Sequence, residues 1–201
     1  MKTFLCADYH LGENRFELMG RPFKKPMEMI ETLIENHNKV VSPNDLVYVL
    51  GDVCYQKTPE YLPIIKEFNG KKILVRGNHD KVFTDADFAP YFDEIIPEGE
   101  GINVTFCGIP CYLTHYPTRG AKDKFNLVGH IHAAWKYQLN MLNVGVDVHH
   151  FSPVDADTID FHLKAITEFY DRDVWVAYEK INTDYRDSRG KKSTYFESES
   201  K

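Results

Sequence analysis

The sequence lacks any long hydrophobic run, and this excludes a membrane-spanning protein at the outset. No stretch approaches the roughly 18 apolar residues that a transmembrane helix needs. The apolar start, Met1 to Cys6, is too short for a signal peptide, and Asp8 follows at once. We therefore expect a protein without membrane contact and with a cytoplasmic location.

Cysteine and positive charge are also scarce. The four cysteines, at 6, 54, 107 and 111, do not have the spacing of a zinc finger, and we expect them to be reduced thiols of an intracellular protein. The formal net charge of −6 argues against a broad basic face for nucleic-acid binding. Nucleic acid is therefore not a favoured partner.

The length and composition are those of a globular domain. The chain has 201 residues, of which 43% are hydrophobic and 27% are charged, and this suits one domain with a full core. We expect a single domain over residues 1–181. The polar residues 182–201 are expected to form a loosely packed tail. The oligomeric state does not follow from the sequence.

The first 80 residues alternate between strand and helix patterns. Short apolar runs at 3–7, 46–50 and 73–75 are typical of strands buried on both faces. Between them, helical spacing covers 26–41 and 58–69, each with a proline near its start. The order β-α-β-α-β predicts a parallel arrangement.

The second half has a different pattern. Residues 102–106 and 111–114 flank 107–110 and predict a β-hairpin. Residues 142–148 predict a further strand, and residues 155–170 predict a helix.

Polar side chains that bind metals or transfer protons follow five of the apolar runs. They are Asp8 and His10, then Asp52, then Asn78 and His79, then His115, then His130 and His132. Sites in open α/β sheets form beyond the carboxyl ends of the strands, so we expect these groups to converge. In an extended chain, Asp-x-His and His-x-His each direct both side chains to one side.

This set of donors is too large for one metal ion. With His79 set aside, it has two aspartates, one asparagine and four histidines, and such donors suit Mn, Fe, Zn or Co. Two ions about 3.5–4 Å apart that share a bridging carboxylate would use all seven. Such a pair can clamp the oxygens of a phosphoryl displacement and supply hydroxide as the nucleophile.

Glycine precedes three of the predicted ligands, at Gly51, Gly77 and Gly129. Glycine permits the sharp turns and close backbone approach that a crowded metal centre requires. Asn78 would add a neutral oxygen ligand, without negative charge that would repel a phosphate.

Taken together, these motifs resemble those of the calcineurin-like metallophosphoesterase superfamily, especially its small, compact bacterial and phage-type members. All five blocks occur in the family's order: Asp8-Tyr9-His10, Gly51-Asp52, Gly77-Asn78-His79-Asp80, His115 and Gly129-His130-Ile131-His132. The resemblance implies an α/β fold, a four-layer αββα sandwich of two mixed β-sheets flanked by helices. It also implies two divalent transition metal ions, with Mn as the first expectation and Fe, Zn, Co or Ni as alternatives.

The resemblance further implies a role for each motif residue. Asp8, His10, Asp52 and His132 would hold one ion, and Asp52, Asn78, His115 and His130 would hold the other, with Asp52 as the bridge. His79 would face the substrate, stabilise the phosphate oxygens and protonate the leaving group. Asp80 would orient the His79 ring and raise its basicity.

Several other residues have two interpretations each. A contact with substrate phosphate or a solvated charge is open for Arg15, Arg21, Arg119, Lys122 and Lys124. Tyr9 would flank the substrate or pack in the core. A place near the site or in a turn is open for His149 and His150. For Asp147, a structural turn or a contact that supports a ligand is preferred to direct metal ligation.

The predicted function is hydrolysis of a phosphodiester or phosphomonoester, of small nucleotide-like type, by hydroxide that bridges two metal ions. The alternatives are a nuclease or protein phosphatase of the same superfamily, or a catalytically silent metal-binding scaffold. A silent scaffold is expected to have lost ligands, whereas the full set is present here.

Overall fold

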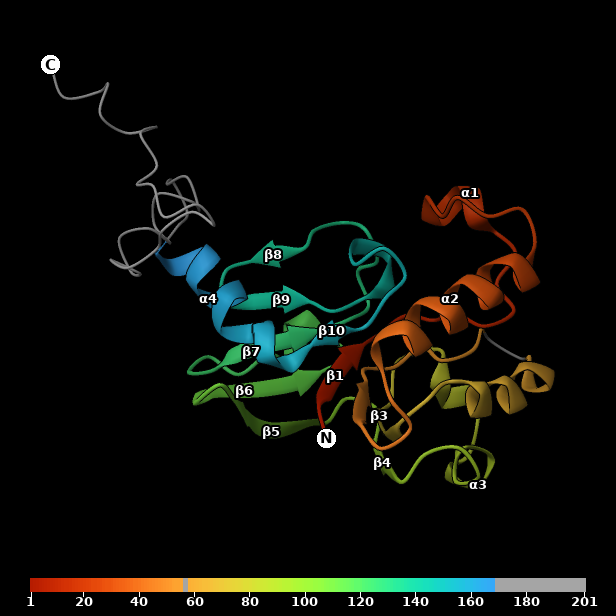
Figure 1. The fold of residues 1–201 in the computed structure, drawn as a ribbon, viewed down its shortest axis with the longest axis horizontal. Coiled ribbons are helices and arrows are strands. Elements are labelled where there is room, and N and C mark those ends of the chain that lie inside the picture. Colours follow the sequence, from red (N-terminus) through yellow and green to blue (C-terminus); the bar gives the residue numbers. More distant parts are fainter. Residues whose placement is uncertain (56–57, 169–201) are drawn as a thin grey trace, which may run out of the picture. The chain divides into compact units, whose positions relative to one another are not determined.

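Two mixed five-stranded sheets form the centre of the fold (Figure 1). The structure is a computed structural model that describes residues 1–55 and 58–168. The chain divides into two compact units, residues 1–163 and residues 164–201. The predicted tail and the predicted domain end at residue 181 lie outside the described residues.

The first sheet has the strand order β10-β1-β2-β3-β4. Its strands are β1 (Thr3–Cys6), β2 (Leu46–Val49), β3 (Lys71–Val75), β4 (Glu94–Ile96) and β10 (Val154–Asp155). Strands β1 to β4 are parallel, and β10 runs antiparallel to β1. The parallel arrangement predicted for the first three strands is confirmed.

The second sheet has the order β5-β6-β7-β9-β8. Its strands are β5 (Gly101–Phe106), β6 (Ile109–Thr114), β7 (Phe125–Val128), β8 (Tyr137–Gln138) and β9 (Met141–Asn143). The predicted hairpin is β5–β6, and its turn is only Cys107 and Gly108, with φ of 51° and 78°. A two-residue turn with both φ positive follows the twist of the strands.

Helices complete the four layers. Helix α2 (Pro26–Val40), the 3₁₀ helix η1 (Pro59–Glu67) and α3 (Asp85–Phe88) contribute to one core with the first sheet. Helix α4 (Ile159–Thr167) contacts the second sheet, where Tyr137 Oη and His162 Nδ1 are 2.6 Å apart. The remaining short helices are α1 (Phe16–Met19), η2 (Asp80–Val82), η3 (Pro117–Arg119), η4 (Val146–Val148) and η5 (Ala156–Thr158).

Two predicted elements differ from the structure. The predicted helix after residue 58 is a 3₁₀ helix, and Pro63 inside it has no N–H for an α-helical hydrogen bond. The predicted strand 142–148 ends at Asn143, because the Asn143 side chain accepts from the Gly145 backbone N–H at 2.8 Å. The chain then turns, and Val146 donates to the Ala7 carbonyl at 3.1 Å, which joins the ends of the two sheets.

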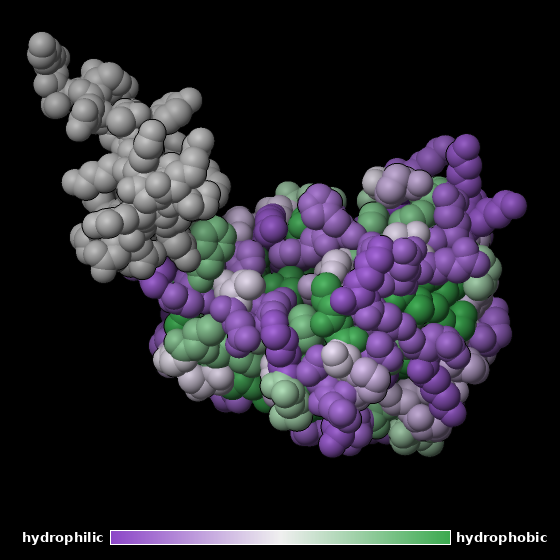
Figure 2. Space-filling model, in the orientation of Figure 1, coloured by the Kyte–Doolittle hydropathy of each residue, from purple (hydrophilic) through white to green (hydrophobic). Residues whose placement is uncertain are grey.

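The surface view agrees with the charged composition. On the face shown in Figure 2, hydrophilic side chains dominate, and hydrophobic ones appear in the gaps between them. Among the described residues, no helix is both long and apolar enough to span a membrane. The four cysteines are free thiols, as expected.

A buried histidine links α2 to the end of β1. His37 is 1% exposed, and its Nε2 lies 2.9 Å from the Asn69 carbonyl, which can only accept. Nδ1 therefore accepts from the Tyr9 hydroxyl, 3.0 Å away. The Tyr9 ring stacks on Phe68 with centroids 4.9 Å apart, so Tyr9 packs in the core and does not flank a substrate.

We predict that His37 makes the fold acid-sensitive. Burial lowers the pKa of His37 to about 4, from an ordinary value of about 6.5. Between pH 6.5 and pH 4, His37 is protonated in the unfolded chain but neutral in the folded protein. The free energy of unfolding therefore decreases as the pH falls through this range. The loss from this residue at pH 4.5 is about 2–3 kcal/mol. Urea unfolding of metal-free protein at pH 7 and 4.5 measures it, and His37→Gln should lose clearly less. An equal loss in both proteins would contradict the prediction.

Candidate metal centre

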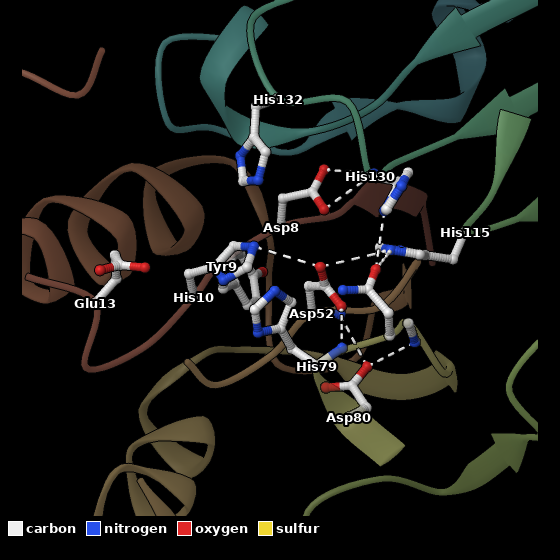
Figure 3. A network of polar contacts seen from close by, with 12 residues as sticks. Asp8, Tyr9, His10, Glu13, Asp52, His79, Asp80, His115, His130 and His132 are labelled. Carbon is white, nitrogen blue, oxygen red and sulfur yellow. Dashed lines mark hydrogen bonds and ion pairs between the residues drawn. The ribbon is translucent and has the colours of Figure 1, made fainter. Parts of the chain in front are cut away.

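The candidate ligands lie at the carboxyl ends of five strands, as predicted. Strands β1, β2 and β3 of the first sheet and β6 and β7 of the second end at this site. The pairing of β1 with β2 continues past the strands, since the backbone N–H of Asp8 donates to Gly51 O at 3.0 Å and that of His10 to Asp52 O at 2.9 Å. Figure 3 shows the side chains directed toward one region.

The backbone at the site has an unusual conformation. Asp8, His10, Asp52, His130 and His132 have positive φ, from 47° to 78°. Such values are uncommon for residues with a side chain and cost of order 1–3 kcal/mol each. The surrounding structure must maintain them, and their concentration at one place indicates a functional site.

Asp52 lies at the centre of the cluster. Its Oδ2 is 3.4 Å from His10 Nε2 and 3.5 Å from His115 Nε2. Its Oδ1 accepts from the backbone N–H of His79 at 2.9 Å. Potential metal-binding atoms form two groups, each within 4.8 Å, and both groups include Asp52. The groups are His10, Asp52 and His79, and Asp52, His115 and His130.

Asp8 and Asn78 connect the two sheets at the site. Both carboxylate oxygens of Asp8 lie 3.0 Å from the backbone N of His130. The Asn78 Oδ1 is 3.1 Å from His115 Nε2 and 2.9 Å from His130 Nδ1. An amide oxygen and two imidazole nitrogens thus meet at one point beside Asp52.

The donors fit divalent transition metal ions. Both ring nitrogens of His10 are buried and have no hydrogen-bond partner among the described residues. A buried imidazole without partners is costly unless a ligand uses it. His115 donates from Nδ1 to the Leu50 carbonyl at 2.7 Å, so its Nε2 is available as a ligand atom on the Asp52 side.

The protonation of the site is also suited to metal binding. Burial lowers the pKa of His10 to about 4 and also lowers the pKa of His130, so both imidazoles are neutral near pH 7. Burial raises the pKa of Asp8 to about 6. Although burial opposes it, the neighbouring imidazoles of His10 and His115 hold the pKa of Asp52 below its ordinary value. Nearby cations would stabilise both carboxylates.

His132 is fixed by a network that begins at Arg21. The Arg21 side chain is fully buried and binds Asp147 through Nε at 2.7 Å and Nη2 at 2.9 Å. It also donates to the carbonyls of Asp8 and Tyr9. Asp147 Oδ2 lies 3.1 Å from His132 Nδ1, which leaves Nε2 as the ligand atom. The structural contact expected of Asp147 is confirmed. Both interpretations of Arg21, a solvated charge and a contact with substrate phosphate, are wrong because its side chain is buried in this network.

The contacts of the Asp80 carboxylate differ from those predicted. It is fully buried, and its carboxylate accepts from the backbone N–H groups of Asp52, Val53 and Gly77 at 2.8, 2.9 and 2.8 Å. No described contact joins it to the His79 ring (Figure 3). Asp80 therefore holds the ends of β2 and β3 together and does not orient His79.

The glycine before Asn78 is required sterically. A Cβ on Gly77 would collide with Asp52 Oδ1 and lie 2.7 Å from His115 Cε1. Gly51, with φ of 83°, would place a Cβ 2.5 Å from the Gly77 backbone N. Both positions need glycine because the two strand ends approach each other closely.

The other candidate residues either make structural contacts or are exposed. His149 donates to the Asn143 carbonyl at 2.8 Å, and the His150 carbonyl accepts from Asn36, so both make structural contacts. Lys124 donates to Asn103 on β5. Arg119 and Lys122 are exposed, and no described contact joins them to the cluster.

A second arrangement lies beside the cluster and includes Arg15, one of the residues with two interpretations. Glu13 is 1% exposed, and its carboxylate accepts from Arg15 Nε and Nη2 at 3.1 and 3.0 Å. The Arg15 guanidinium lies 4.5 Å from the centroid of the Tyr55 ring. Tyr55 comes from the loop after β2, so no local spacing in the sequence links it to Arg15.

Comparison with known proteins agrees with the motifs. The family model for calcineurin-like phosphoesterases matches residues 1–177. An uncharacterized protein of Methanocaldococcus jannaschii, MJ1445, is 31% identical over 79% of this chain and 89% of its own length.

Solved structures are also similar. A protein of unknown function from Aquifex aeolicus, AQ665, matches 80% of this chain and 98% of its own, with 27% identity and a TM-score of 0.64. An archaeal phosphodiesterase matches 72% of this chain and 82% of its own, with 17% identity and a TM-score of 0.44. With the family's model extending over most of its length, the chain belongs to the calcineurin-like phosphoesterases.

Proposed function

We propose that this protein is a dinuclear metal-dependent phosphoesterase that hydrolyses a small, nucleotide-like phosphate ester. The observation that carries the proposal is the position of Asp52, whose carboxylate belongs to both groups of metal-binding atoms. A carboxylate shared in this way can bridge two ions, and paired ions can clamp a phosphoryl group during displacement. Membership of the phosphoesterase family supports the same reaction class.

The ligand assignment divides the candidate donors into two sets that share Asp52. We assign one ion to Asp8, His10, Asp52 and His132 and the other to Asp52, Asn78, His115 and His130. Neutral imidazoles and oxygen donors suit Mn, with Fe, Zn, Co or Ni as alternatives. When bound, such ions would stabilise charge on the phosphate and lower the pKa of coordinated water.

Side chains of the protein would position the ester and transfer the proton. His79 is half-buried, and its ring centroid lies 4.7 Å from that of His10, so it can reach a phosphate at the metal site. It would donate a proton to the leaving oxygen, which then departs as the alcohol. A hollow of about 410 Å³ borders His10, His79 and His132, and this size supports a small substrate.

The first test is hydrolysis by Mn-loaded protein of an aryl phosphodiester and the matching monoester, with release of the aryl alcohol as the readout. We expect turnover of at least one class, and a loss of at least about 100-fold in Asp52→Ala because both ions lose a ligand. Circular dichroism checks that the variant is folded. Absence of turnover in the wild type would favour the silent scaffold, and full activity of the variant would refute the bridge.

A second test separates proton transfer from metal binding at His79. His79→Ala should lower kcat by about 100- to 10,000-fold, the usual contribution of a general acid. The metal content should not change, since we assign no ion to His79. Emission spectrometry of the dialysed variant measures it. Loss of metal from His79→Ala would instead make His79 a ligand, as its position beside His10 and Asp52 allows.

A third test concerns Asp80. Asp80→Asn replaces an acceptor-only group with an amide whose NH₂ opposes a backbone N–H, so we expect a loss of roughly 2–3 kcal/mol of folding stability. Urea unfolding of the metal-free proteins measures this loss. Unchanged stability with a reduced kcat would restore the idea that Asp80 acts through the His79 ring.

A further inference from the structure

The hollow beside the metal-binding cluster has one polar and one apolar wall. His10, His79 and His132 border it on the cluster side. Leu18 and Met19 of α1 border it together with Ile131, Ala133 and Ala134 from the loop after β7. Leu18 is 78% exposed, so an apolar side chain stands in solvent next to the site. These walls can cover a flat apolar group attached to a phosphate.

Arg15 also lines this hollow, and it is held in place from two sides. Glu13 engages Nε and Nη2, which fixes the plane of the guanidinium and leaves Nη1 unengaged by Glu13. Tyr55 covers one face of that plane at 4.5 Å. Although burial opposes it, the hydrogen bonds from Arg15 lower the pKa of Glu13, so the pair is ionised. Figure 3 places Glu13 beyond His10, outside the cluster.

The Glu13 carboxylate changes what Arg15 can recognise. It offsets most of the guanidinium charge, so Arg15 is a weak general attractor of anions. What remains is a rigid plane with donors at Nη1, and such a plane stacks on aromatic rings and hydrogen-bonds their acceptors. The Glu13 carboxylate also accepts from the backbone N–H groups of Asn14 and Arg15 at 2.9 and 2.7 Å, so it fixes both the backbone that carries Arg15 and the guanidinium.

We propose that this hollow is the subsite for the nucleoside part of the substrate, and that Arg15 contacts the base while Leu18 and Met19 cover it. This inference rests on the proposed function, because it places the phosphate at the metal site. A larger hollow of about 750 Å³ adjoins, also bordered by Arg15 and Leu18, and it contains none of the cluster's side chains. Arg15 and Leu18 therefore border both hollows.

The test compares two ligands with the same anionic group and no ester bond to hydrolyse, an adenosine phosphonate and methylphosphonate. Titration calorimetry of Mn-loaded protein measures both. We expect Arg15→Ala to weaken adenosine phosphonate binding by at least about tenfold and Leu18→Ala to weaken it about fivefold. Binding of methylphosphonate should change less than about twofold. Arg15→Lys should behave like Arg15→Ala, because lysine keeps the charge but not the plane.

Leu139→Ala is the matched control for Leu18→Ala, since Leu139 is 76% exposed in the turn between β8 and β9. It should leave both affinities unchanged. Equal effects of Arg15→Ala on the two phosphonates, full retention of affinity by Arg15→Lys, or no effect of Leu18→Ala would each overturn the subsite.

Failure of the subsite and failure of the proposed function are distinguishable. If the protein hydrolyses phosphate esters but does not discriminate between the phosphonates, the subsite alone is refuted. If it hydrolyses no ester, the proposed function fails, and the binding comparison still decides whether the hollow recognises a nucleoside.

Discussion

The site depends on the crowding of buried carboxylates and imidazoles around Asp52. Asp8, Asp52 and Asp80 are all nearly inaccessible to solvent, and burying three acids without strong partners would destabilise the fold. Each of the three carboxylates has different partners. Asp80 is satisfied by backbone N–H groups, Asp8 contacts the His130 backbone, and Asp52 lies between imidazoles. Among the described residues at this site, His10 has both ring nitrogens buried without a hydrogen-bond partner, and there we place the cations.

The rest of the site keeps that crowded region in place. Five ligand candidates have positive φ, and such a backbone persists only when its surroundings determine it. Asp80 ties β2 to β3, and Arg21 ties the carbonyls after β1 to Asp147. His37 supports the same loop through its hydrogen bond to Tyr9, whose ring stacks on Phe68. Hydrogen bonds from residues outside the ligand set thus help to maintain the strained backbone conformation of the ligands.

Much of this arrangement could be predicted from the sequence. Apolar runs that end in Asp, Asn or His located the strand ends and the direction of the first sheet, because period and composition are local properties. The 3₁₀ form of η1 and the early end of β9 were not predicted, since they depend on Pro63 within the helix and on the Asn143 side chain. The contacts of Asp80 with Val53 and of Arg15 with Tyr55 could not be predicted either, because in both cases the partner comes from another loop of the folded chain.

The metal content per chain distinguishes an Asp52 that bridges two ions from a site that holds only one. Purified protein loaded with Mn and dialysed should hold two ions per chain by emission spectrometry. Asp52→Asn keeps the shape but removes the bridging charge, so it should retain at most one ion. A single ion in the wild type, or two ions in both proteins, would contradict the bridged site.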